Sequence, residues 1–136
     1  MMVAQGVRRL FRASGIASIC EVVLSNARRA DIVGIAADGS VTIVEVKSSV
    51  QDFRCDSKWP EYIDYCDCFY FAAPADMDLS IFPSHTGLIV ADSYGAEIVR
   101  ASHAAKLNGS RRRSMLLTFA RTAALQLQAL HDPQSL

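Results

Sequence analysis

The sequence predicts an α/β fold in which a mixed β-sheet carries helices on its faces. Helical and strand-like patterns follow one another in the order α-β-β-β-α-β-β-β-α. Two apolar segments, residues 31–36 and 41–47, flank the sequence ADGS, which is typical of a β-hairpin turn. An amphipathic pattern over residues 110–130 predicts a long C-terminal helix.

Length and composition indicate a single globular domain over residues 1–136. Hydrophobic residues make up 51% of the chain and charged residues 21%, as in ordinary soluble proteins. No apolar run approaches the roughly 20 residues that span a bilayer, and the N-terminal segment lacks the apolar core of a secretory signal. We therefore expect a cytoplasmic protein with no membrane partner. The formal net charge of zero gives no global signal for nucleic acid.

The first half of the chain is expected to form one helix and three strands. Val7, Leu10 and Phe11 fall on one face of a helical pattern in residues 4–14, with arginines on the other faces. The segment SICEVVL at residues 18–24 predicts a strand, and the polar turn SNARR separates it from the hairpin. Short connections of this kind join antiparallel neighbours in a sheet.

The second half is expected to supply the crossover, three more strands and the last helix. The polar stretch 49–66 is broken by Pro60 and predicts one irregular helix or two short ones. CDCFYFAAP predicts a strand that ends at Pro74, and GLIVAD and AEIVR predict a second hairpin around SYG. The expected buried stripe of the last helix is Leu116, Phe119, Ala120, Ala123, Leu127 and Leu130.

Charged side chains stand at the ends of the hairpin strands, where an unpaired buried charge costs several kcal/mol. In an antiparallel pair, directly opposed residues share a face of the sheet. If residues 37–39 form the loop and Gly39 is left-handed, Asp31 lies opposite Glu45. A two-residue loop would shift the register and place these two carboxylates on opposite faces. The charges themselves favour the first register.

The preceding strand extends this cluster. A turn centred on Asn26 places Glu21 opposite Asp31. Glu45 and Lys47 are two residues apart in a strand and therefore point to the same face. One face of the sheet would then carry three carboxylates and a lysine. Carboxylates this close repel one another, which raises a pKa or recruits a cation.

Such a cluster is suited to a divalent metal ion. Carboxylate oxygens are the ligands that Mg²⁺ (or Mn²⁺) prefers, and Mg²⁺ usually adds waters and a substrate phosphate. Lys47 beside the metal can orient or activate a water and stabilise charge on a phosphate. The pattern therefore predicts metal-assisted hydrolysis of a phosphodiester. The expected catalytic residues are Asp31, Glu45, Lys47 and Glu21.

Basic and hydroxyl side chains flank the cluster and are candidates for contacts with nucleic-acid phosphates. They are Arg28, Arg29, Ser48, Arg54 and Lys58. Ser48 and Ser49 can alternatively cap the helix that follows, because serine is a favoured N-cap residue. Trp59 can stack on an unpaired base, or it can anchor its helix on the sheet.

The order of these charges resembles the PD-(D/E)XK nuclease superfamily of restriction-endonuclease-like folds. Asp31 is followed after thirteen intervening residues by Glu-Val-Lys at 45–47, with Glu21 upstream and Ala30 in place of the usual proline. Longer stretches are similar to the MmcB-like DNA-repair endonucleases of bacteria: RRADIVGI, IVEVKSSVQDFRCDSKWPEYIDYCDCFYFA, GLIVADSYGAEIVR and RRRSMLLTFARTAAL. The similarity covers about residues 7–130.

This resemblance implies a restriction-endonuclease-like fold with an α-β-β-β-α-β core, divalent-metal dependence, DNA as a partner and a role in DNA repair. Carried over residue by residue, it makes Asp31 and Glu45 metal-binding acids and Lys47 the catalytic lysine. Val46 would supply a backbone carbonyl to the metal, and Glu21 matches the auxiliary upstream acid.

Other functions are compatible with the same residues. In a non-catalytic nucleic-acid-binding or scaffold domain, Lys47 would pair with a carboxylate at the strand end, and Glu21 and Asp31 would be solvated. A hydrolase for a small phosphorylated molecule is less favoured, because the chain has no glycine-rich phosphate loop. The zero net charge and small size favour the non-catalytic domain, because small nucleases often need a homodimer or a repair-protein partner to grip DNA.

Overall fold

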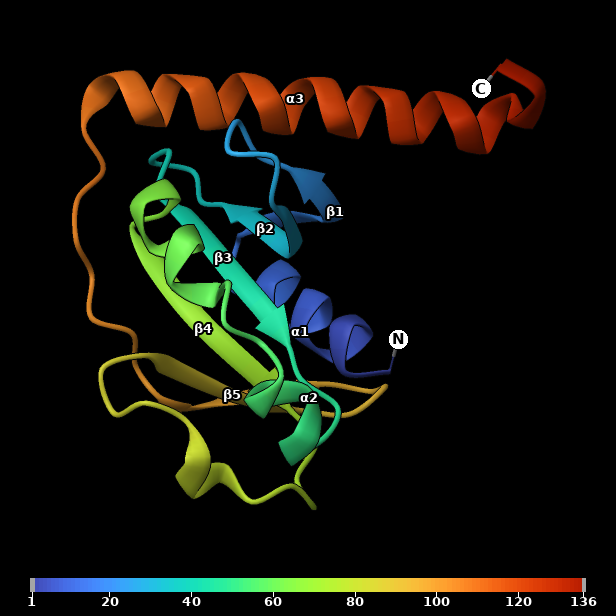
Figure 1. Cartoon of the computed structure of the whole chain (residues 1–136). Helices are drawn as coiled ribbons and strands as arrows, with labels where there is room; N and C mark the ends of the chain where they lie inside the picture. Colours follow the sequence, from blue (N-terminus) through green and yellow to red (C-terminus); the bar gives the residue numbers. More distant parts are fainter. Residues whose placement is uncertain (1, 136) are drawn as a thin grey trace.

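A computed structural model describes residues 2–135 of the chain (Figure 1). The helices are α1 (Met2–Ala13), α2 (Val50–Arg54) and α3 (Gly109–His131), with short 3₁₀ helices η1 (Trp59–Tyr65), η2 (Leu79–Ile81) and η3 (Pro133–Ser135). The strands are β1 (Ala17–Val23), β2 (Arg29–Ile35), β3 (Val41–Val46), β4 (Cys68–Ala73), β5 (Gly87–Ala91) and β6 (Ala96–Arg100). Within the described residues, no helix is long and apolar enough to cross a membrane.

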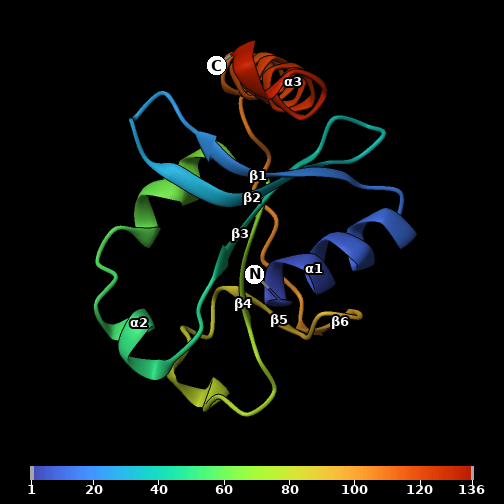
Figure 2. The same cartoon turned by 90° about the vertical axis from the view of Figure 1, so that its right-hand side faces the viewer.

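The strands form one mixed sheet in the order β1-β2-β3-β4-β5-β6. The first three strands pair antiparallel, β3, β4 and β5 pair parallel, and β6 returns antiparallel to β5. α2 and η1 lie in the crossover that a parallel β3–β4 pair requires. α1 covers one face of the sheet, whereas η1, α2 and the start of α3 cover the other (Figure 2). The predicted α/β sheet with its C-terminal hairpin and long helix is confirmed.

On the first face, α1 packs as its helical pattern predicts. Val7 and Phe11 are buried against Ile32 and Val44 of the central strands. Gly6 allows a close approach, because a β-carbon there would collide with main-chain oxygens at the β5–β6 turn. The arginines of α1 lie outside this core and are exposed.

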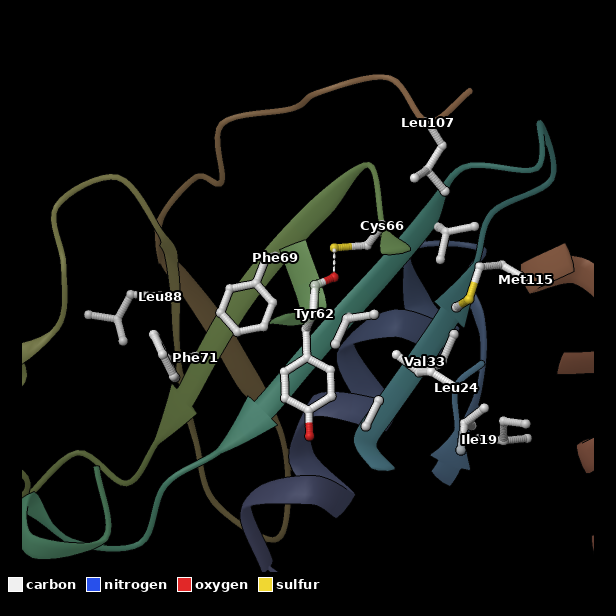
Figure 3. Close-up of a cluster of buried hydrophobic side chains, with 14 of the residues drawn as sticks. Ile19, Leu24, Val33, Tyr62, Cys66, Phe69, Phe71, Leu88, Leu107 and Met115 are labelled. Carbon is white, nitrogen blue, oxygen red and sulfur yellow. Dashed lines mark hydrogen bonds between the residues drawn. The ribbon is translucent and has the colours of Figure 1, made fainter. Parts of the chain in front are cut away.

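The core on the opposite face is rich in aromatic rings (Figure 3). The ring of Tyr62 stacks on that of Phe69 with centroids 6.4 Å apart, and Phe69 meets Phe71 edge to face at 5.1 Å. Trp59 stacks on Phe69 at 5.9 Å, so it anchors η1 on the sheet, which was one of its two expected roles. These contacts fix the crossover segment and the polar residues that precede η1.

Both predicted hairpin registers are confirmed. In the β2–β3 pair, Val33 lies opposite Ile43, and Gly39 in the connecting loop is left-handed with a φ of 86°. In the β1–β2 pair, Cys20 lies opposite Ile32. The charged residues therefore have the expected positions along their strands, and local backbone geometry decides where their side chains point.

The predicted buried stripe of α3 is wrong at Ala120, which is exposed, and in its second half. Met115 is buried, and Phe119 and Ala123 pack against the core, but Leu127 and Leu130 are 54% and 78% exposed. The cause is length, because α3 extends well past the edge of the sheet and its later turns have no sheet beneath them (Figure 1). Apolar spacing indicates this helix correctly but overstates its burial.

Candidate functional site

Asp31 and Glu45 lie side by side where the β2–β3 ladder ends. The last paired residues are Ile32 and Val44. Beyond them, the main-chain N–H of Asp31 donates to Oε1 of Glu45 at 3.2 Å. The N–H of Val46 donates to Oδ2 of Asp31 at 2.8 Å. Side-chain carboxylates thus replace main-chain partners at this end of the strand pair, which fixes the positions of both acids.

The environment of Glu45 is unfavourable for a charged carboxylate, since the residue is only 5% exposed. Burial, the negative charge of Asp31 and a side-chain hydrogen bond with Asp31 raise the pKa of Glu45 to about 9. The charge of Lys47 acts in the opposite direction but does not compensate. Glu45 therefore keeps its proton at neutral pH, and the two carboxyl groups avoid a direct clash of charges.

Lys47 follows β3 directly, and its spacing places it on the same face as Glu45. The residue is 7% exposed, and its Nζ donates to Oδ2 of Asp56 at 2.6 Å. The other oxygen of Asp56 accepts from the main-chain N–H groups of Lys58 and Trp59. Burial acts to raise the pKa of Asp56, but these hydrogen bonds together lower it. The predicted catalytic lysine is therefore held in a buried ion pair.

Asp56 is the site residue that sequence reasoning misses. It lies nine residues after Lys47, and Arg54 and Lys58 offer it nearer partners in sequence. The path of the crossover segment brings Asp56 to Lys47, and the spacing of these residues in the sequence does not predict this ion pair. The available signal is an Asx turn, in which an aspartate accepts from N–H groups two and three residues further on.

Glu21 departs from the predicted cluster. Its side chain is exposed and its φ of 58° is left-handed, whereas the prediction assumes a regular strand. The faces of β1 exchange at this residue, because Ile19 and Val22 both belong to the core on the α3 side. Among residues 2–135, no three Asp, Glu, His or Cys side chains form a group that could hold a metal. The predicted common face of three carboxylates is therefore wrong, and the pair of Asp31 and Glu45 remains.

The predicted phosphate contacts are spread around this pair. Arg28 forms a two-pronged ion pair with Glu61, at 3.2 and 3.0 Å. The hydroxyl of Ser48 donates to Asp52, and Ser49 caps α2, the alternative role expected for these serines. The exposed basic candidates are Arg29, Arg54 and Lys58. An incoming phosphate would compete with Glu61 for Arg28, whereas the exposed side chains are available to it.

The donor set at the end of β3 fits a magnesium ion. Mg²⁺ is usually held by one or two carboxylates together with waters and substrate phosphate. Asp31 and Glu45 supply two carboxylates side by side, and the main-chain carbonyl of Val46 would be a further ligand. Burial and the repulsion from Asp31 raise the pKa of Glu45, and a bound cation would offset both, so it would take the place of the proton on this carboxyl.

Glu45→Gln is expected to stabilise the metal-free protein. In the unfolded chain Glu45 ionises near its ordinary pKa of 4.5, whereas in the folded protein its pKa is about 9. The folded state binds the extra proton, so the free energy of unfolding falls as pH rises between these two values. Glu45→Gln has no carboxyl group at this position, so its free energy of unfolding does not fall for this reason. Its free energy of unfolding should match wild type near pH 4 and exceed it increasingly up to pH 8, by at most about 1.4 kcal/mol for each pH unit.

Urea unfolding in EDTA across this pH range measures the effect of Glu45→Gln. Glu97→Gln changes an exposed carboxylate of β6 and is the matched control, which should follow wild type at every pH. If Glu45→Gln is less stable than wild type near pH 8, Glu45 is ionised and well compensated in the folded protein, and the expectation is wrong.

The fold and the site together define an α/β protein with a mixed sheet in which a carboxylate pair and a buried lysine lie at the end of a central strand. The family described as DNA repair protein MmcB-like matches residues 1–134. The chain belongs to this MmcB-like family, which confirms the family that the sequence resembles.

A solved structure has the same fold. The "SPO1766 protein of unknown function from Silicibacter pomeroyi" is 39% identical, with a TM-score of 0.95, over 98% of this chain and 91% of that one. No curated protein matches the chain. Since the structural relative is itself described as a protein of unknown function, the activity has to be argued from the site.

Proposed function

We propose that the protein is a metal-dependent DNA endonuclease of the PD-(D/E)XK type that acts in DNA repair. The observation that carries the proposal is the Asp31–Glu45 carboxylate pair with Lys47 two residues further along the chain. The description of the family as a DNA repair protein supports DNA as the substrate. Two carboxylates, a divalent ion and a lysine are suited to the hydrolysis of a phosphodiester.

Each residue of the site would have a distinct role. Asp31, Glu45 and the carbonyl of Val46 would hold Mg²⁺ or Mn²⁺, which supplies Lewis-acid stabilisation of a phosphate and lowers the pKa of a bound water. Glu45 would release its proton as it becomes a ligand. Lys47 would place its ammonium group beside the phosphate and orient the attacking water. Asp56 positions Lys47 through the ion pair.

Cleavage of a DNA panel tests the proposal, with single-stranded, duplex, flapped, branched and abasic substrates in Mg²⁺, Mn²⁺ or EDTA. We expect cutting that requires the metal and is lost in Glu45→Gln. As a second readout, Mg²⁺ should raise the melting temperature of wild type more than that of Glu45→Gln, because the variant lacks a ligand. Cutting in EDTA, or cutting that survives Glu45→Gln, would contradict the assignment of the site.

A non-catalytic or partner-dependent DNA-binding module is the second candidate. The buried ion pair between Lys47 and Asp56 favours it, because this pair occupies the ammonium group that catalysis would use. This candidate predicts DNA binding that is independent of metal, with no cutting of any substrate in the panel. Cutting that appears only at concentrations where the chain dimerises, or only with an added repair protein, would assign the partner-dependent form.

A further inference from the structure

A hollow of about 620 Å³ lies between α1 and β1. Figure 2 shows α1 on one face of the sheet, beside β1. Arg8, Arg9 and Arg12 line it from α1, and Ser18 and Cys20 line it from β1, which is an edge strand. We refer to this hollow as the α1–β1 groove. It is formed by residues that the proposed metal site does not use.

The three arginines form one stripe of α1. Together with Gln5 they recur at helical spacing, and the core-facing residues of the helix lie on its other side. All three are exposed, and α1 contains no acidic residue. Among the residues that the structure describes, no acidic residue lines the groove either, so its described walls offer these charges no carboxylate.

Arg8 is held in place by neutral groups. Its Nε donates to the hydroxyl of Ser18 at 3.2 Å, and its Nη2 donates to the carbonyl of Ser18 at 2.8 Å. A guanidinium has five N–H donors, so Arg8 keeps its charge and has donors to spare for a ligand. Arg28 and Arg112, by contrast, are bound to carboxylates. The groove therefore presents oriented and uncompensated positive charge.

We propose that the α1–β1 groove binds the phosphate backbone of a nucleic-acid strand. Arginines bind phosphates through paired, charge-assisted hydrogen bonds. Arg8 and Arg12 lie one helical turn apart, and Arg9 lies between them in sequence, so the row suits a repeating polyanion better than a single anion. The remaining lining includes Ala4, Ile16 and Ala17 beside the charges, and these offer apolar surface to a sugar or base.

An anionic membrane is the other extended polyanion that a basic helix can bind. Helices of that kind insert their apolar face into the bilayer. In α1 this face is occupied, because Val7 and Phe11 are 0% and 2% exposed beneath the sheet. The packing of α1 therefore favours a nucleic acid.

The groove lies on the face of the sheet opposite the carboxylate pair. Cys20 lines it and lies opposite Ile32, the residue next to Asp31. The pKa of the Cys20 thiol is raised chiefly by burial, and the charges of Glu21 and Asp31 add to this effect against that of Arg8. Because neighbouring residues of a strand point to opposite faces, a nucleic-acid strand in the groove would be separated from the Asp31 carboxylate by the sheet. The inference rests on the proposed function for the choice of DNA as the ligand.

Binding measured without metal tests the groove separately from cleavage. Fluorescence anisotropy in EDTA follows labelled single-stranded and duplex DNA with the full chain. For Arg9→Gln/Arg12→Gln we expect the affinity for DNA to fall by about tenfold or more. The slope of the logarithm of the binding constant against the logarithm of the salt concentration should become smaller in magnitude by about two. Arg113→Gln/Arg121→Gln removes the same charge from exposed positions of α3 and should retain wild-type binding.

Several outcomes would contradict the proposal that the α1–β1 groove binds nucleic acid. Equal losses of affinity in both double variants would show that net charge alone causes the effect. Unchanged binding in Arg9→Gln/Arg12→Gln would show that the groove does not contact DNA. Wild-type protein that binds no DNA, or that binds only vesicles of anionic lipid, would also refute it. A failure of the proposed function is distinguishable, because wild type would then bind DNA through the groove and cut none of the substrate panel.

Discussion

Lys47→Met is expected to lower the rate constant of metal-dependent DNA cleavage by at least about 10²-fold. Methionine keeps the aliphatic stem of a side chain that is 7% exposed and removes the ammonium group. Cleavage falls because no positive charge then stabilises the phosphate or orients the water. Single-turnover assays on the preferred substrate of the panel measure this loss, and unchanged binding of that substrate in EDTA shows that the DNA interface is intact.

Loss of cleavage in Lys47→Met does not by itself separate catalysis from a structural ion pair, since Asp56 loses its partner as well. Asp56→Asn is the matched control, because it breaks the same ion pair and keeps the ammonium group. We expect both variants to lose stability, because each leaves one buried group without its counter-charge. Asp56→Asn should retain measurable cleavage. Equal loss of cleavage in both variants would assign Lys47 a structural role.

The position of the Asp31–Glu45 carboxylate pair could be predicted from the sequence, because a local feature, the loop between β2 and β3, sets it. Gly39 takes a left-handed φ of 86° at no steric cost, and this loop geometry sets the β2–β3 register. That register brings Asp31 to Glu45, as expected from the sequence. The face of α1 is predictable for a similar reason, because the 3.6-residue period alone places its apolar residues together.

The remaining features depend on irregular backbone or on contacts between distant segments. A left-handed glutamate is rare, so the strand period fails at Glu21, and no local signal marks the exception. The partner of Lys47 is decided by the path of the crossover, which brings Asp56 back to the end of β3. The exposure of Leu130 follows from the extent of the sheet beneath α3, a property that the helix sequence does not contain.

The site also explains why apolar strands carry charges. Glu45 and Lys47 are buried, and neither placement favours folding, since one carboxyl must keep its proton and the lysine needs a buried partner. Strands hold ligands in more fixed positions than loops do, which is an advantage for a metal site. The expected gain in stability of Glu45→Gln and its expected loss of cleavage therefore have one cause.

Asp67→Ala is expected to lower the free energy of unfolding by about 3 kcal/mol. The carboxylate of Asp67 accepts from the main-chain N–H groups of Val41 at 2.7 Å and Leu107 at 2.9 Å. It also accepts from both Nη atoms of Arg112, each at 2.8 Å. One side chain therefore joins the start of β3, the segment before α3 and α3 itself. Alanine would leave the two buried N–H groups without a partner.

The size of this effect follows from the burial of Asp67, which is 9% exposed. The expected loss in the free energy of unfolding lies near the lower end of the range for a broken buried ion pair, because the side chain of Arg112 is 22% exposed and solvent screens its charge. A domain is typically stable by about 5–15 kcal/mol, so the variant should still fold, with a melting temperature lower by about 10 °C. Urea and thermal unfolding measure both quantities. Asp64→Ala is the control, because its side chain is exposed and its carbonyl, which binds Arg111, is retained.

The pH dependence of the Asp67→Ala effect separates the contribution of the carboxylate charge from that of the neutral carboxyl group. Hydrogen bonds from Arg112 and from the main chain hold the pKa of Asp67 well below its ordinary range. A lowered pKa stabilises the fold above the unfolded value of about 3.9, and this contribution is lost as pH falls through the folded value. The difference between wild type and Asp67→Ala should therefore narrow in acid. A difference that stays constant down to about pH 2 would show that the neutral carboxyl holds these three segments together as well as the ion does.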